Sequence, residues 1–205
     1  DYEEKLVQLI KQETHFVRWG ADVKGLSVVS VGCDNFDGGY QVTEHVIKNN
    51  RQHFAFLGGV STGSPEFLDR YTGHCQALKD NNLKVDSNLQ IDAISTDESG
   101  YQAAKQLIAK GIKFDAICTA SDLIAIGAMR AIQEAGYNVP GDVAIAGFDD
   151  IATACSTSPA LTTAKQDTVL AGEILVDKLL QLVSGEEAHT QLMPATLVVR
   201  KSCGS

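Results

Sequence analysis

Two short apolar runs, separated by one helical pattern, constrain the fold of this chain more than any other feature. The first run, Ala116 to Ala120, is too short for a typical helix, and Ser121 after it has a hydroxyl suited to capping a helix start. The second run, Val143 to Phe148, is apolar on both alternations, which is typical of a strand covered on both faces of a parallel sheet. These residues predict a strand, a helix and a second, parallel strand.

The segment between the two runs has the spacing of an amphipathic helix. Ile126, Met129 and Ile132 recur at helical intervals. Gly136 follows them, and glycine tolerates the left-handed conformation found just past many helix ends. The helix is therefore expected to end near Gly136.

Acidic residues follow both predicted strands. Ser121-Asp122 comes after the first strand and Asp149-Asp150 after the second. Ligands of open parallel sheets bind in the crevice outside the carboxyl ends of the strands. The two acidic loops therefore indicate a polar ligand that is neutral or cationic.

The same alternation of short apolar runs and helical patterns recurs along the chain, which predicts βαβ units and a mostly parallel α/β sheet. We expect strands near residues 15–17, 28–31, 54–57, 90–94, 116–120, 143–148 and 196–199. We expect helices near residues 6–10, 38–47, 65–82, 99–110, 122–136 and 170–183.

Composition excludes several classes of protein. With 205 residues, 44% of them hydrophobic, the chain can bury a substantial core. The net charge of −9 and the lack of a dense run of Lys and Arg oppose a nucleic-acid surface, so this stretch alone should not bind DNA.

The five scattered cysteines, with no Cys-x-x-Cys spacing, favour a reduced, cytoplasmic setting over a secreted one. The sequence shows no membrane-spanning stretch and no signal peptide, so no membrane partner is expected. Because the first residue is Asp1 and not Met, a processed or truncated start is expected.

A series of short motifs follows one order along the chain. They are Asp34-Asn35 with Gly38-Gly39-Tyr40, Arg70 to Ala77, Glu98 to Tyr101, Ala120 to Leu123, Asn138 to Val143, Gly147 to Asp150, Ser158 to Thr163, and Gln166-Asp167. Together these motifs resemble the C-terminal half of the LacI/GalR family of bacterial transcription regulators. The resemblance covers nearly the whole chain, and so many motifs in the same order are specific.

The resemblance implies an effector-binding core of the periplasmic-binding-protein type I architecture. Such a core has two Rossmann-like parallel-sheet subdomains, joined by three crossing segments, with a small molecule between them. It also implies a homodimer, and DNA binding through a helix-turn-helix domain absent from this chain.

By the same resemblance, the first subdomain comprises residues 1–34 and 165–190, and the second comprises residues 35–164 and 191–205. The crossings are expected near Asp34-Asn35, Lys165-Gln166 and Leu192. Since the family starts with a helix-turn-helix, a hinge helix and a first βαβ unit, the first subdomain is expected to be incomplete.

Asp149 and Arg70 are the main candidates for ligand contact. A carboxylate accepts hydrogen bonds from two hydroxyl groups, which suits a sugar, although Asp149 could instead cap the following turn. Arg70 lies inside the helix that begins at Ser64, and helical side chains lean toward the amino terminus, so its guanidinium can reach the crevice. The plainer alternative for Arg70 is an ion pair with Asp69 or Glu66.

Five further candidates have strong structural alternatives. Ser121 and Asp122 can serve as helix cap and first-turn anion as well as ligand contacts, and Ser64 is also suited to capping. Trp19, the one tryptophan, can pack against a sugar or fill a core, and Arg18 beside it can bind the ligand or remain solvated.

Catalytic and metal-binding patterns are weak in this sequence. The loop from Gly58 to Ser64 lacks the lysine of a phosphate-binding loop, and His74 and Cys75 are neighbours on a helix, so they point in different directions. No histidine or carboxylate spacing indicates a metal site. We expect no cofactor, no metal and no enzymatic activity.

The favoured hypothesis is the effector-binding and dimerisation core of a LacI/GalR-type repressor that responds to a sugar or related metabolite. Two alternatives remain open at this point. One is a periplasmic-type sugar-binding receptor of a transporter, and the other is an α/β enzyme that acts on a carbohydrate.

Overall fold

The computed structural model describes residues 2–21, 28–61 and 64–204, and these residues form two compact units. Unit 1 comprises the residues up to Asp34 and Asp167–Met193, and unit 2 comprises Asn35–Gln166 and the residues from Pro194 onward. That unit 1 is the incomplete amino-terminal subdomain of the family stays a prediction. In the described residues no helix is long and apolar enough to cross a membrane.

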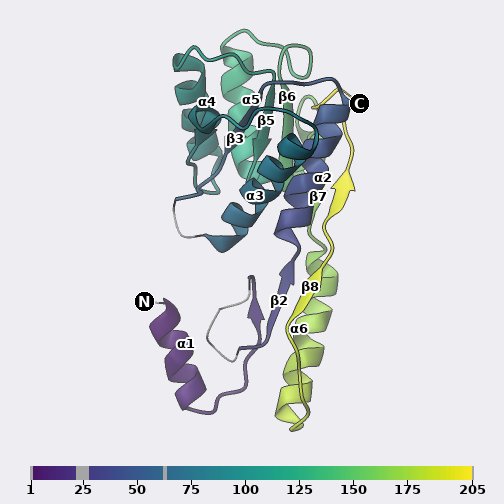
Figure 1. Ribbon diagram of the computed structural model, residues 1–205. Coiled ribbons are helices and arrows are strands. Elements are labelled where there is room, and N and C mark those ends of the chain that lie inside the picture. The colour runs from purple at the N-terminus through teal and green to yellow at the C-terminus, as the bar shows by residue number, and fades with distance from the viewer. Residues whose placement is uncertain (1, 22–27, 62–63, 205) are drawn as a thin grey trace. The chain divides into compact units, whose positions relative to one another are not determined.

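Unit 2 is built on a six-stranded sheet (Figure 1). Its strand order is β4-β3-β5-β6-β7-β9, and all neighbours are parallel except β7 and β9. The strands are β3 (Phe54–Leu57), β4 (Gln90–Ile91), β5 (Ala116–Thr119), β6 (Ala144–Asp149), β7 (Thr162–Lys165) and β9 (Thr196–Val198). Every residue of β3 and β5 is buried, as the apolar runs predict.

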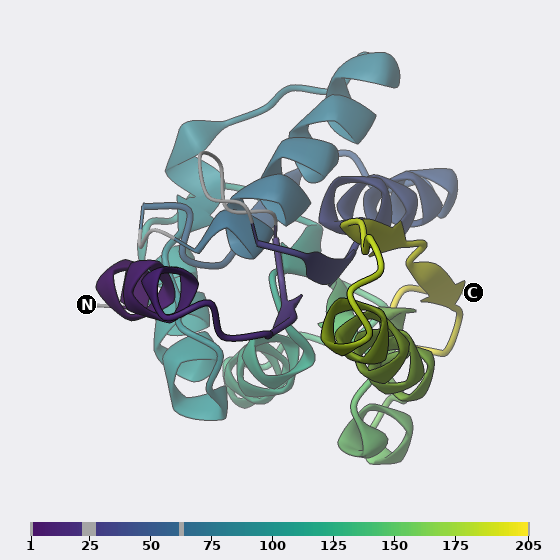
Figure 2. The ribbon, with the colours of Figure 1, turned by 90° about the horizontal axis from the view of Figure 1, so that it is seen from below.

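Helices cover both faces of this sheet. Helices α2 (Asn35–Lys48) and α3 (Pro65–Asp80) pack together on one face, and α4 (Asp97–Ala109) and α5 (Asp122–Glu134) on the other (Figure 2). Two 3₁₀ helices, Ser87–Leu89 and Ala152–Ser156, complete the unit. The structure confirms the expected fold class, an α/β fold with a mostly parallel sheet.

The strand order of unit 2 reverses beside β3. The chain runs from β3 outward to β4, and then crosses back to β5 on the other side of β3. Such a reversal separates the loops that leave the two strands, and it is where open α/β sheets bind ligands. The carboxyl ends of β5 and its neighbour β6 carry Ala120 and Asp149.

Polar side chains cap three of the helices, and of these caps only the one at Ser121 was expected from the sequence. The Thr96 hydroxyl accepts a hydrogen bond from the amide of Ser99, and the Ser121 hydroxyl accepts one from the amide of Ile124. Asp167 caps α6 (Thr168–Val183) in the same way. Ser64 differs, because it occupies the cap position of α3 without a side-chain cap bond and its hydroxyl donates to Glu66 at 3.3 Å.

Unit 1 is smaller. It contains α1 (Tyr2–Lys11), α6 (Thr168–Val183) and a parallel sheet of order β1-β2-β8, formed by Arg18–Trp19, Ser30–Cys33 and Gln191–Met193. Its core is small and centres on Val31, Ala171 and Met193. Several apolar side chains of α6 are exposed within the described residues: Val169, Leu170, Val176, Leu180 and Val183.

Some element boundaries differ from the predictions. Helix α2 begins at Asn35 and not near Gly38, and β1 lies at Arg18–Trp19 instead of residues 15–17. Strands β7 and β8 were not expected, because neither is an apolar run and both depend on pairing with distant strands. The predicted loop from Gly58 to Ser64 includes residues 62 and 63, which lie outside the described residues.

Candidate functional site

Arg70 and Asp149 come together in unit 2. Arg70 lies on α3 and Asp149 is the last residue of β6, and Nη1 of the arginine is 3.2 Å from Oδ1 of the aspartate. The Arg70 side chain is 5% exposed and that of Asp149 is 26% exposed. The pair therefore presents its carboxylate, more than its guanidinium, to a ligand.

Arg70 is held on several sides. Its Nε donates to Asn35 Oδ1 at 2.8 Å, and its Nη1 donates to the carbonyl oxygen of Ala120. Its guanidinium carbon lies 3.7 Å from the centre of the Phe148 ring, a cation–π contact. Because a buried charge without partners is costly, this enclosure explains how Arg70 stays charged with so little exposure.

The backbone at Asp149 is unusual. Asp149 has φ of 114° and Asp150 has φ of 56°, in the region that favours glycine. Backbone strain of this kind costs on the order of 1–3 kcal/mol and clusters at functional sites. Burial raises the pKa of Asp149, while Arg70 and a hydrogen bond from Gln166 Nε2 at 2.6 Å counteract that rise.

Asp150 has a separate partner, although it is adjacent to Asp149. Its Oδ1 lies 2.7 Å from Nη2 of Arg200, whose Nη1 donates to the carbonyl oxygen of Leu161. Asp150 is therefore part of an ion pair that fastens the strand-end turn to the C-terminal segment.

Asp122 is fully buried, and both of its oxygens are used. Oδ1 accepts from the Thr163 hydroxyl at 2.6 Å, and Oδ2 accepts from the amide of Ile151 at 2.9 Å. Burial raises the pKa of Asp122 to about 7, and the nearby Asp149 and Asp150 add to the rise. This arrangement favours a structural role for Asp122 over direct ligand contact.

The two serine candidates also have structural roles. Ser121 is 1% exposed, caps α5 and accepts a hydrogen bond from the Ser95 hydroxyl at 2.9 Å. Ser64 is half-buried and bonded to Glu66. Within the described residues neither serine side chain is hydrogen-bonded to Arg70 or Asp149, so their roles as ligand contacts stay predictions.

Trp19 and Arg18 belong to β1 of unit 1. Trp19 is 40% exposed, which is compatible with contact to a partner or ligand, and the Arg18 guanidinium donates to the carbonyl oxygen of Ala21. Their proposed ligand contacts remain predictions.

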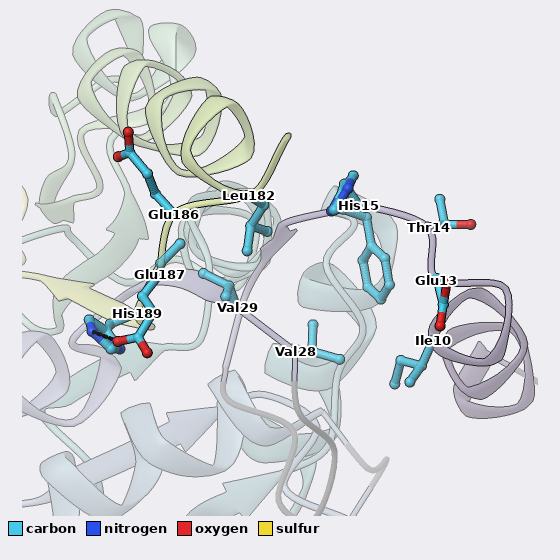
Figure 3. A pocket seen from close by; sticks show the side chains of 12 residues that line it. Ile10, Glu13, Thr14, His15, Val28, Val29, Leu182, Glu186, Glu187 and His189 are labelled. Atoms are coloured by element: carbon cyan, nitrogen blue, oxygen red, sulfur yellow. Dashed lines mark ion pairs between the residues drawn. The ribbon is translucent and has the colours of Figure 1, made fainter. Parts of the chain in front are cut away.

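A hollow of about 600 Å³ lies in unit 1, apart from the predicted site residues (Figure 3). Its lining includes Ile10, Phe16 and Leu182 together with the acidic Glu13, Glu186 and Glu187. His189 lies 3.9 Å from Glu187, and both side chains are more than four-fifths exposed. An ion pair this exposed to solvent contributes little to stability and does not mark a built site. We therefore place the candidate site at Arg70 and Asp149 and not in this hollow.

His74 and Cys75 do not form a nucleophile and base pair. His74 Nδ1 is hydrogen-bonded to the Thr43 hydroxyl at 2.9 Å, and complete burial lowers the pKa of His74 to about 3. Burial also raises the pKa of Cys75. No group of three His, Cys, Asp or Glu suited to a metal occurs among the described residues.

Sequence reasoning missed two hydrogen-bonded neighbours of the pair, Asn35 and Gln166, and also Arg200, the partner of Asp150. The first two fall inside motifs of the family resemblance, which was the available signal. Phe148 was expected to pack, and it does so beneath the Arg70 guanidinium.

Known proteins share this architecture. A protein-family model described as a periplasmic binding protein-like domain matches residues 43–203. The lactose operon repressor of Escherichia coli (strain K12) is 36% identical over 167 residues, which are 81% of this chain and 46% of that protein.

Two solved structures are also similar. The complex of the transcriptional regulator CelR with cellobiose has a TM-score of 0.89 and 28% identity, over 95% of this chain and 60% of that chain. A transcriptional regulator assigned to the LacI family from Sanguibacter keddieii has a TM-score of 0.85 and 30% identity, over 93% of this chain and 72% of that chain.

These matches define the fold as a periplasmic binding protein-like domain. The chain belongs to the LacI family of transcriptional regulators, of which it covers the effector-binding core. It spans about half the length of the curated relatives it matches. The family and fold expected from the sequence are confirmed.

Proposed function

We infer that this chain binds a sugar or related small metabolite and forms the dimerisation core of a LacI-type regulator. The effector would control DNA binding by a helix-turn-helix domain outside these residues, in the cytoplasm. The relatives are transcriptional regulators, which supports this role and favours binding without turnover.

The observation that carries the proposal is the position of the Arg70–Asp149 pair. It lies at the carboxyl ends of β5 and β6, beside the reversal of strand order where ligands of α/β sheets bind. Both hydrogen bonds to Asp149 end on Oδ1, so within the described residues Oδ2 is left to accept a ligand hydroxyl. The similar CelR structure holds cellobiose, which supports a sugar as the class of ligand.

The proposal is tested by ligand binding to the protein expressed from its complete gene. A thermal-shift screen of mono- and disaccharides, with cellobiose among them, identifies a hit, because a ligand that binds the native state raises the melting temperature. Isothermal titration calorimetry then measures its affinity. A complete screen without any hit would reject a sugar as the effector.

Asp149→Ala and Arg70→Ala are each expected to weaken this binding strongly. Loss of a buried hydrogen-bonding partner costs about 1–3 kcal/mol, which corresponds to roughly tenfold to a hundredfold in affinity. Asp150→Ala is the matched control, because that carboxylate is adjacent but engaged by Arg200, and it should retain the affinity of the unsubstituted protein. Circular dichroism checks that all three variants fold. An equal loss of ligand affinity in Asp149→Ala and Asp150→Ala would contradict the assignment of Asp149 to the binding site.

Three further measurements test the remaining parts of the proposal. Sedimentation velocity should show a dimer, and the hit should change the mobility shift of operator DNA by the complete protein. Chromatography after incubation should recover the sugar unaltered. Recovery of a cleaved or modified sugar would favour an enzyme instead.

A further inference from the structure

Four side chains of unit 2 form one continuous hydrogen-bonded series. Asn35 Oδ1 accepts from Arg70 Nε at 2.8 Å, Arg70 Nη1 donates to Asp149 Oδ1 at 3.2 Å, and Gln166 Nε2 donates to the same Oδ1 at 2.6 Å. The series therefore runs Asn35, Arg70, Asp149, Gln166. The candidate effector-binding pair forms its two middle members.

The two ends of the series coincide with points where the chain passes between the units. Asn35 is the first residue of unit 2 after Asp34, and Gln166 is the last residue before the chain returns to unit 1 at Asp167. The chain crosses between the units at three points, and at two of them the adjoining residue of unit 2, Asn35 or Gln166, is hydrogen-bonded to the candidate site. The third passage, at Met193 and Pro194, contributes no member.

Burial makes the part of the series from Asn35 to Arg70 stiff. Asn35 and Arg70 are 6% and 4% exposed, so a bond broken there would leave buried polar atoms without water. The guanidinium is a planar fork, so Nε and Nη1 move together. The ring of Phe148 beneath the guanidinium further restricts its tilt.

A single atom joins the two halves of the series. Asp149 Oδ1 accepts from both Arg70 and Gln166, so a ligand that draws the Asp149 carboxylate toward itself alters both bonds at once. A change at the pair is thereby passed to Asn35 on one side and to Gln166 on the other.

We propose that Asn35 and Gln166 are positioning residues that couple effector occupancy at Arg70 and Asp149 to two of the chain passages between the units. This inference rests on the proposed function for the identity of the middle pair as a ligand site. The series itself is a property of the ligand-free protein, so the two ideas can fail separately.

The first experiment needs no ligand. Hydrogen–deuterium exchange with mass spectrometry follows peptides over residues 32–40 and 163–170 in the complete protein. Gln166→Met, which keeps length but removes the donor, should speed exchange in the distant 32–40 peptide. Asn35→Ala should do the same in the 163–170 peptide. Each increase should be about fivefold, the factor expected for loss of one hydrogen bond.

Matched variants separate coupling from local damage. Gln76→Met removes a similar bond to Asp80 on the exposed surface of α3, and it should leave both peptides unchanged. In an Arg70→Met background the distant effects of the Asn35 and Gln166 substitutions should disappear, because the middle of the series is lost. Purely local changes in every variant, with no distant effect, would overturn the proposal.

The second experiment uses the sugar identified in the thermal-shift screen. In the unsubstituted protein the sugar should slow exchange in both passage peptides. In Gln166→Met, sugar at a saturating concentration should still slow exchange in the 32–40 peptide, because the bonds from Asp149 through Arg70 to Asn35 remain, but it should no longer change the 163–170 peptide. If no sugar binds, the proposed effector class fails, while the ligand-free exchange result still decides whether the series exists. If saturating sugar still slows exchange in the 163–170 peptide of Gln166→Met, the coupling role of Gln166 fails although the ligand site stands.

Discussion

Three aspartates near one another have different roles because their partners differ. Asp149 shares a single oxygen with Arg70 and Gln166 and remains partly exposed. Asp150 is paired with Arg200, and Asp122 is buried with a hydroxyl and an amide as its donors. Of the three, Asp149 has the combination of exposure and free acceptor capacity that a polar ligand requires.

The buried Asp122 should make stability depend on pH. Its pKa is raised from 3.8 to about 7 in the folded protein, so the protonated form is favoured by folding. The stability contributed by the proton is present below about pH 4 and is lost as pH rises through about 7. Asp122→Asn has no such loss, so it should gain at least about 1 kcal/mol relative to the unsubstituted protein between pH 5 and pH 8.

Urea unfolding at the two pH values measures this difference. Asparagine can keep both contacts, since its oxygen can accept from Ile151 and its amide can donate to the Thr163 hydroxyl. Asp122→Ala loses both and should be destabilised at either pH. A pH-independent difference between Asp122→Asn and the unsubstituted protein would show that Asp122 is not protonated near neutral pH.

At the scale of elements, the two helices within each helix pair of unit 2 approach each other closely at a glycine. A Cβ at Gly127 of α5 would lie 1.9 Å from the carbonyl oxygen of Asp97, and one at Gly73 of α3 would lie 2.0 Å from that of Phe36. No side chain fits at these distances, so the glycines permit backbone-to-backbone packing. The same requirement explains Gly39 inside α2, where a Cβ would lie 2.2 Å from the carbonyl oxygen of Arg70, although glycine has poor helix propensity. At Gly38 the neighbour is a side chain, because a Cβ there would lie 2.6 Å from the ring of Phe148.

Gly127→Ala is therefore expected to destabilise the protein by about 1–3 kcal/mol through overpacking. Gly172→Ala in α6 is the matched control, since a Cβ there has no neighbour within 4 Å among the described residues. That control should be neutral or stabilising by up to about 1 kcal/mol, because alanine is the better helix former. Thermal unfolding followed by circular dichroism measures both, and a tolerated Gly127→Ala would contradict the close packing of α4 and α5.

At the scale of the whole molecule, burial is unevenly distributed between the units. In the described part of unit 1 the buried apolar residues are few: Leu6, Val28, Val31, Cys33, Ala171 and Met193. Unit 2 contains the fully buried β3, β5 and most of β6. Local stability follows buried apolar contact, so the two units should open with different free energies.

Native-state hydrogen exchange on a polypeptide of these 205 residues is expected to show this difference. Amides of β3, β5 and β6 should exchange most slowly, and those of α6, β1 and β2 should exchange faster. Equal protection of α6 and β5 would mean that the exposed apolar side chains of α6 are covered in solution.

The sequence by itself determined the class of fold, the order of most helices and strands, and the family. These depend on local periodicity, on caps such as Ser121 and on motifs that can be read along the chain. The short strands β7 and β8 escaped prediction because pairing partners, and not their own composition, make them strands.

Only the tertiary structure decided which candidates meet. Arg70 and Asp149 are 79 positions apart, and Asn35 and Gln166 join them only because α2, α3 and β6 fold to the same end of the sheet. It also separated the roles of Asp122, Asp149 and Asp150, which are chemically identical in the sequence. The reason is physical: burial, charge and hydrogen-bond partners are properties of the surroundings of a side chain, and those surroundings exist only after the chain has folded.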